Sequence, residues 1–149
     1  MRTIAVADLP TLETTVVGPG PWHEVSQQQV NQFADATGDH QWIHVDPDAA
    51  AKGPFGTTIA HGYLMLSLIP MLASQAYAVE GVRMGVNYGL NKMRLPSPVP
   101  VGSRVRLRAT LAGYEAIAGG AAATIGLTFE VDGQAKPACV AEVIYRYYA

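Results

Sequence analysis

The chain has 149 residues, of which 49% are hydrophobic and only 15% are charged, and its formal net charge is −2. This length fits one domain with a sizeable core, and the apolar composition excludes an intrinsically disordered chain. The near-neutral charge gives no general attraction to nucleic acid or to an anionic membrane, so we expect a single domain over residues 1–149 that binds neither.

The N-terminal segment MRTIAVADLP has one arginine followed by a short apolar run that Asp8 and Pro10 interrupt. It is too weakly apolar for a secretory signal. Cys139 is the only cysteine, so no intrachain disulfide and no cysteine-based metal cluster can form. Its apolar neighbours favour a buried, inert thiol. The sequence therefore predicts a cytoplasmic protein.

The first predicted helix covers residues 27–37. Ser26 precedes it with Gln29 three positions later, which is a capping-box pattern, and Gly38 follows as a C-cap. Within the helix, Val30, Phe33, Ala34 and Thr37 fall on one face.

Asp39 and His44 come next, in the polar stretch DHQWIHVD, with Gly38 before it and Pro47 after it. This bracketing predicts a loop or an extended segment, before a brief helix that Asp46 caps and that ends at Ala51. A carboxylate and an imidazole that converge can hold a water molecule and supply a base and an acid near neutral pH. A core histidine beside a turn-capping aspartate is the structural alternative, and the pair alone favours it.

Residues 59–79 are strongly apolar, but His61, Ser67, Pro70 and Gln75 interrupt them. We interpret them as a helix that starts near Gly62, is kinked at Pro70 and is surrounded by the protein itself, rather than as a membrane span. The amide of Gly62 at the helix start can stabilise a developing oxyanion. Ser67 is a polar exception in this helix, and a hydroxyl bonded to its own helix is the alternative reading.

The second half of the chain changes to the alternating pattern of strands. Residues 81–100 read as a strand closed by prolines, and in residues 104–111 arginines alternate with apolar residues. Gly119–Gly120 and Asp132–Gly133 predict hairpin turns before a last strand that ends in YRYYA. Helices followed by hairpin-connected strands indicate an α+β fold with an antiparallel sheet that curls around the long apolar helix.

Three aromatic residues and two histidines can each be explained by chemistry or by structure. Trp42, Phe55 and Tyr63 can line an acyl channel, although core packing explains them equally well. His40 and His44 have metal-ligand spacing only on a helix, so a metal site is disfavoured. No nucleotide-phosphate loop occurs.

The stretches FADATGDHQWIHVDPDAA and FGTTIAHGYLMLSLI resemble the two motifs of the MaoC-like dehydratases, a family that includes the (R)-specific enoyl-CoA hydratases. The motifs are roughly GDxNPxHxDxxxA and xxxHGxLxxSL, and they occur here in the same order. The resemblance extends from about Val25 to Leu111.

The resemblance implies a hotdog fold, in which a curved antiparallel sheet wraps around one long central helix, and a homodimer with an acyl-thioester site near the subunit interface. It implies that Asp39 and His44 activate the water that attacks C3 of a trans-2-enoyl thioester, giving a (3R)-3-hydroxyacyl product. Gly62 matches the oxyanion donor, and Ser67 matches a supporting serine. No metal or redox cofactor is implied, since coenzyme A is part of the substrate.

Gln41-Trp42 replaces the family's Asn-Pro, so we assign Gln41 and Trp42, with Phe55 and Tyr63, to substrate binding. Two rival functions are a hotdog thioesterase and a non-catalytic thioester-binding partner subunit. Residues 61–78 contain no Asp or Glu, which counts against hydrolysis. Retention of both Asp39 and His44 counts against a non-catalytic subunit.

Overall fold

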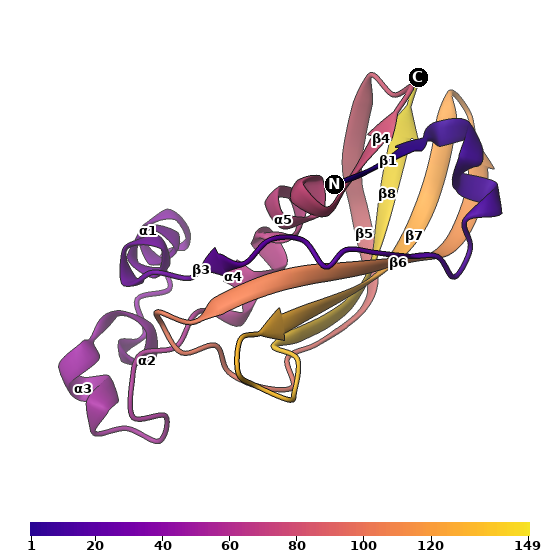
Figure 1. The fold of residues 1–149 in the computed structure, drawn as a ribbon. Helices are drawn as coiled ribbons and strands as arrows, with labels where there is room; N and C mark the ends of the chain where they lie inside the picture. Colours follow the sequence, from indigo (N-terminus) through magenta and orange to yellow (C-terminus); the bar gives the residue numbers. More distant parts are fainter.

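The computed structural model describes residues 1–149 (Figure 1). Its elements, in chain order, are β1 (Arg2–Ala5), the 3₁₀ helix η1 (Val6–Thr11), β2 (Val16–Val17), β3 (His23–Glu24), α1 (Gln27–Thr37), α2 (Trp42–Val45), α3 (Pro47–Ala51), α4 (Gly62–Ser67), α5 (Ile69–Ala76), β4 (Tyr77–Glu80), β5 (Met84–Arg94), β6 (Arg104–Ile117), β7 (Gly120–Val131) and β8 (Cys139–Tyr148).

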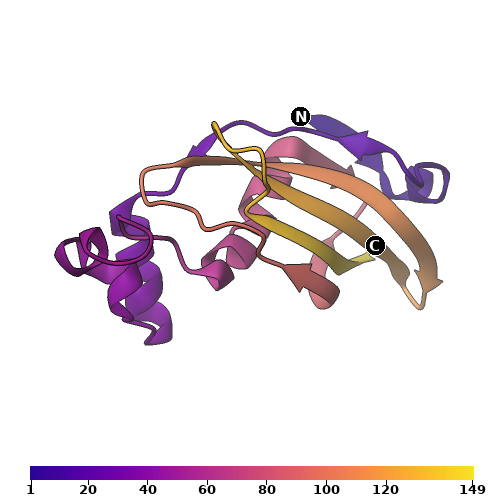
Figure 2. The same ribbon diagram turned by 90° about the horizontal axis from the view of Figure 1, so that it is seen from below.

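The main sheet is antiparallel, with strand order β2-β6-β7-β8-β5 and with β3 also paired to β6. Alternate residues of β6 and β7 are buried, so one face of these strands forms the core, as the alternation in residues 104–111 predicts. The sheet is curved, and α4 and α5 lie against one of its faces (Figure 2). The α+β class and the hotdog architecture are both confirmed.

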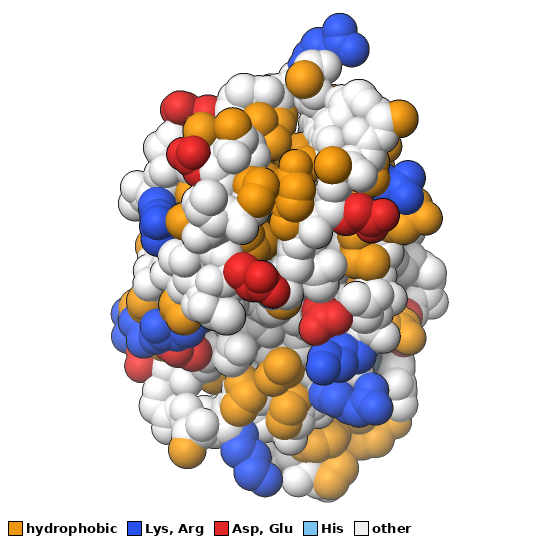
Figure 3. Space-filling model, turned by 90° about the vertical axis from the view of Figure 1, so that its right-hand side faces the viewer, with side chains coloured by type: hydrophobic (Ala, Val, Ile, Leu, Met, Phe, Trp, Pro, Cys, Tyr) orange, Lys and Arg blue, Asp and Glu red, His pale blue; other side chains and the backbone are white.

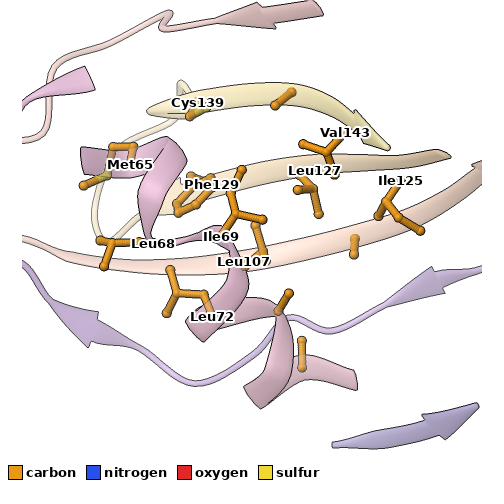
Figure 4. Packing of buried hydrophobic residues seen from close by; sticks show 14 of the residues in the cluster. Met65, Leu68, Ile69, Leu72, Leu107, Ile125, Leu127, Phe129, Cys139 and Val143 are labelled. Atoms are coloured by element: carbon orange, nitrogen blue, oxygen red, sulfur yellow. The ribbon is translucent and has the colours of Figure 1, made fainter. Parts of the chain in front are cut away.

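The central helix packs its apolar side chains on the sheet. Ile69 lies beside Phe129 of β7, and Met65, Leu68 and Leu72 belong to the same buried cluster as residues of β6, β7 and β8 (Figure 4). This burial holds the start of α4 at a fixed place relative to the sheet.

The central helix differs in three details from the expected helix kinked at Pro70. The helix is divided into α4 and α5 at Leu68, and Pro70 lies in the first turn of α5, where its missing N–H costs nothing. It ends at Ala76, because residues 77–80 form β4 and pair in parallel with β1. One face of the helix, which includes Tyr63 and Ser67, is exposed in the single chain.

The predicted caps of α1 are present. The Ser26 side chain accepts a hydrogen bond from the Gln29 amide, and Gly38 is left-handed with φ of 81°. The Gln29 side chain, however, contacts the His23 ring at 3.0 Å instead of completing the capping box. Asp46 caps α3 as expected, through a hydrogen bond from the Ala49 amide.

The polar segment between α1 and α3 is more helical than predicted. Residues 42–45 form α2, whose last turn is closed by a hydrogen bond from the Asp46 amide to Trp42 O. Gly38 ends α1 and Pro47 begins α3, and one short helical turn fits between them. His44 therefore sits on a helical turn, whereas Asp39 stays in the loop before it.

The two predicted hairpin turns also differ in detail. Gly119 takes the left-handed turn position with φ of 77°, but Gly120 is already the first residue of β7. A Cβ on Gly120 would lie 1.9 Å from Tyr147 O, so the close approach of β8 requires glycine there. Asp132 and Gly133 begin a longer loop that runs to β8.

The helices α1, α2 and α3 gather at one end of the molecule (Figure 1). The opposite end carries acidic, basic and apolar side chains intermixed, and no histidine is visible on that face (Figure 3). No helix in the structure is both long and apolar enough to cross a membrane.

Candidate active site

His44 is buried and held from two directions. Its Nδ1–H donates to the carbonyl oxygen of Ile59 at 2.7 Å, and its own carbonyl accepts a hydrogen bond from the Gln27 side chain at 2.7 Å. Gln27 in turn accepts a hydrogen bond from the Thr58 hydroxyl at 2.6 Å. Because a carbonyl can only accept, the proton of the neutral ring lies on Nδ1 and the lone pair lies on Nε2.

The surroundings of His44 favour this neutral form. Burial lowers the pKa of His44 below the ordinary histidine value of 6.5, and the neighbouring His61 lowers it further. The hydrogen bond to Ile59 and the charge of Asp39 act in the opposite direction but are weaker than burial. Nε2 is therefore available as a proton acceptor at neutral pH.

Asp39 lies beside this ring. The left-handed Gly38 ends α1 and turns the chain, and the Asp39 carboxylate accepts a long hydrogen bond from the Gln41 amide at 3.4 Å. One ligand-type atom from each of Asp39, His44 and His61 lies within 4.8 Å of the other two. The structure thus brings the carboxylate and the imidazole together, as the family resemblance of the two motifs implies.

Gly62 is the first residue of α4. The first amides to donate within α4 are those of Leu64 and Met65, which both bond to His61 O, so the amide of Gly62 lies before the first intrahelical bond. His44 and Gly62 line one hollow of about 260 Å³, together with Phe55, Met65 and Leu95. The residue that carries the proton acceptor and the residue that begins the helix therefore line the same space.

Ser67 is not brought into this hollow. Its hydroxyl donates to Tyr63 O at 2.8 Å, which is the structural alternative considered from the sequence. Ser67 lines a separate hollow of about 320 Å³ between the central helix and strands β5 and β8. Its position on the helix surface depends on how the divided helix rotates against the sheet, which the sequence spacing alone does not give.

The four residues assigned to substrate binding are dispersed. Phe55 lines the hollow beside His44, with 45% of its surface exposed. Trp42 instead packs over Gly53, where an added Cβ would lie 2.8 Å from the indole ring. Gln41 contributes its backbone amide to Asp39, and Tyr63 is exposed. None of these aromatic residues belongs to the core, contrary to the packing alternative.

Two residues of the site were not assigned from the sequence. Gln27 stands in a run of three glutamines that indicates only a helix, and nothing local points to its contact with His44. His61 lies directly before Gly62, is 2% exposed and stacks on the His44 ring with 3.9 Å between ring centroids. Its place in the motif was visible in the sequence, but its contacts were not.

The side chains of Asp39, His44 and His61 could offer donor atoms to a metal ion, with one atom from each within 4.8 Å of the others. His61 Nε2 is 2.9 Å from the Asp39 carbonyl oxygen and must carry a proton to bond there, so only Nδ1 of that ring is free to bind an ion. His40 lies apart from them and bonds to Asp35 at 2.8 Å.

Other candidate chemical groups lie outside this site. Arg104 forms an ion pair with Asp132, and Arg106 and Arg108 both form ion pairs with Glu130. Each of these arginines therefore already has a carboxylate partner. The three arginines form these ion pairs on the outer side of the sheet. Cys139 is fully buried, and burial raises the pKa of its thiol to about 11, which makes it inert.

Known proteins resemble the chain over its whole length. A family model described as "MaoC like domain" matches residues 10–130. The 3-hydroxyacyl-thioester dehydratase Z of Mycobacterium tuberculosis is 58% identical, with 100% of each chain covered. Nodulation protein N of Rhizobium leguminosarum is 42% identical, over 97% of this chain and 91% of its own. The solved (R)-hydratase of A. caviae superposes with a TM-score of 0.70 at 23% identity, over 86% of this chain and 95% of its own.

Proposed function

Because the chain belongs to the MaoC-like dehydratase family, we propose that it is a hydro-lyase that adds water reversibly across the double bond of a trans-2-enoyl thioester. The 58% identity to a protein named as a 3-hydroxyacyl-thioester dehydratase, over both full lengths, supports this reaction class. We further propose that the product is the (3R)-3-hydroxyacyl thioester, with coenzyme A as part of the substrate.

The observation that carries the proposal is the pairing of the neutral His44 imidazole with the Asp39 carboxylate, next to a hollow that His44 and Gly62 both line. His44 has its lone pair on Nε2 because Ile59 O holds the proton on Nδ1. Such a pair is suited to moving a proton to and from water.

In the hydration direction, we propose that a water molecule lies between Asp39 and His44. His44 Nε2 takes one proton while the water oxygen forms its bond to C3 of the substrate. The electron pair of the double bond moves toward the thioester oxygen, which the Gly62 amide stabilises. A proton from the dyad then reaches C2, so that one water molecule is added in total.

The test is turnover of short trans-2-enoyl-CoA substrates by the purified protein. We expect the conjugated enoyl absorbance to disappear and the 3R isomer to accumulate, as judged by chiral chromatography. Release of free thiol without loss of the double bond would point instead to a thioesterase. Tight binding with no change in the substrate would point to a non-catalytic binding subunit.

Removal of metal ions is expected to leave the rate unchanged. The proposed chemistry uses a carboxylate, an imidazole and a backbone amide, and no step of it needs a metal ion. The enoyl-CoA assay would be run before and after dialysis against EDTA, and again with added Zn²⁺. A loss of activity that only a divalent ion restores would contradict this expectation.

We also propose that the chain forms a homodimer through strand β5. This strand lies at the edge of the sheet and pairs only with β8, so its outer N–H and C=O groups are free for another strand. Val86, Tyr88 and Leu90 on this strand are 37–56% exposed, and Ser67 and Leu66 line the hollow beside it. A second copy of the chain would cover this apolar surface.

Charged substitutions on this strand should therefore separate the dimer. Val86→Lys together with Leu90→Lys is expected to change the mass from twice the 15.8 kDa chain to the monomer value in light scattering after size exclusion. Val16→Lys is the matched control, because Val16 is 51% exposed on β2 at the opposite edge of the sheet. A monomeric parent protein, or a dimer that survives the paired substitution, would contradict the proposed interface.

A further inference from the structure

His61 connects the two halves of the proposed dyad. It is 2% exposed, its Nε2 lies 2.9 Å from Asp39 O and 4.0 Å from the nearer Asp39 carboxylate oxygen, and its ring stacks on His44. The stacked rings are 3.9 Å apart between centroids with 24° between their planes, and the Phe33 ring also contacts His61, tilted by 57° with 4.9 Å between centroids. One side chain thus contacts the aspartate loop and the catalytic imidazole at once.

The hydrogen bond fixes which nitrogen of His61 carries the proton. A carbonyl oxygen accepts, so Nε2–H donates to Asp39 O, and the lone pair of the neutral ring lies on Nδ1. That Nδ1 atom is buried and has no hydrogen-bond partner. A buried unpaired nitrogen costs free energy that an apolar side chain of similar size would not, so packing alone does not explain a histidine here.

Few contacts hold Asp39 in place apart from the hydrogen bond from His61. It follows the left-handed Gly38 in an exposed loop, 55% of its side chain is exposed, and the other hydrogen bond on it is the long one from the Gln41 amide. His61, by contrast, is anchored as the residue directly before α4, which packs on the sheet. The bond from His61 therefore ties a loosely held loop to a rigid part of the fold.

We propose that His61 is a positioning residue for hydration, which sets the distance between the Asp39 carboxylate and His44 by donating to the Asp39 backbone. This role rests on the proposed function, since it concerns the geometry of the same dyad. Catalytic groups displaced by about 1 Å can lose roughly 10²-fold in rate, so the support is expected to matter for turnover. Substrate affinity should change little, because His61 is covered and is absent from the lining of the hollow beside His44.

The test compares three replacements of His61. Gln can place an amide N–H near the position of the imidazole Nε2, whereas Asn can reach only the position of Nδ1, and Leu has no donor. We expect His61→Leu and His61→Asn to lower kcat by about 10²-fold with KM changed less than about threefold, and His61→Gln to recover most of the loss. Melting temperatures would identify variants that fail to fold.

A second measurement is independent of turnover. Long-range ¹H–¹⁵N spectra of the ring nitrogens at pH 8 should give the Nε2–H tautomer for His61 and the Nδ1–H tautomer for His44. An Nδ1–H tautomer at His61, a His61→Leu enzyme with parental kcat, or equal losses in the Leu and Gln variants would each overturn the positioning role. Failure of the parent protein to hydrate any enoyl thioester would instead overturn the proposed function, and the role of His61 with it.

Discussion

Replacement of Asp39 by Asn or of His44 by Gln is expected to lower kcat for enoyl-CoA hydration by roughly 10²–10⁴-fold, the range typical of general acid–base groups. Both substitutions keep a side chain of similar shape but remove the ionisable group. His44→Gln also removes the Nε2 lone pair, which the Ile59 carbonyl keeps free of a proton in the parent protein. The rates would be measured from the loss of enoyl absorbance at saturating substrate.

The chain offers matched controls for both substitutions. His40 and Asp35 are exposed, bond to each other at 2.8 Å and lie a few residues from the dyad. His40→Gln and Asp35→Asn should therefore leave the rate near that of the parent. If Asp39→Asn and His44→Gln were as active as these controls, the proposed mechanism would be wrong.

The pH dependence of the parent enzyme follows from the lowered pKa of His44. Because burial disfavours the charged ring, His44 stays in its neutral, proton-accepting form to a lower pH than an ordinary histidine does. The rate of hydration should thus fall only when the pH drops below 6.5, the ordinary value. A fall with its midpoint above 6.5 would mean that His44 is not the base that controls the rate.

Replacement of Gly62 by Ala is expected to reduce kcat strongly by blocking the helix-start amide. An added Cβ at Gly62 would lie 2.3 Å from Leu95 Cδ1, so the leucine side chain, which lines the hollow that His44 and Gly62 share, must move. Loss of one oxyanion donor costs about 10²–10³-fold in kcat, which sets the upper range of the effect. Stability should not fall with it, because the φ of Gly62 is not positive and Leu95 is 44% exposed and free to move.

A second substitution should reverse this loss. Leu95→Ala removes the atoms that the new methyl group displaces, so the double variant Gly62→Ala with Leu95→Ala is expected to regain most of the rate. The interaction between the two changes would be read from the double-mutant cycle of kcat. Equal losses in the single and double variants would indicate that the methyl group acts on something other than Leu95.

For Ser67, the role assigned from the sequence disagrees with its position in the structure. The resemblance implies a supporting role near the dyad, whereas the hydroxyl bonds to its own helix and lines the hollow beside β5. This surface is the one that we propose a second copy of the chain to cover, so Ser67 is better placed to contact a partner than to contact the dyad of its own chain.

Features that depend on near neighbours in the chain were predictable from the sequence. Three of these features involve contacts or torsions within about four residues: the Ser26 cap of α1, the Asp46 cap of α3 and the left-handed Gly38. The buried face of β6 follows from the period of two in a strand. The paired motifs around Asp39 and Gly62 likewise identified the family and the candidate dyad.

Features that join distant segments were decided only by the tertiary structure. His61 reaches Asp39 across 22 positions and Gln27 reaches His44 across 17, and no local pattern encodes these distances. Three further features depend on how the helix packs on the curved sheet: the division of the central helix, the outward direction of Ser67 and the closeness of Leu95 to Gly62. These contacts between distant residues form only when whole helices and strands pack together, because that packing sets the direction in which each side chain points. The sequence thus identified which groups are present for the chemistry, and the fold determined which of them meet.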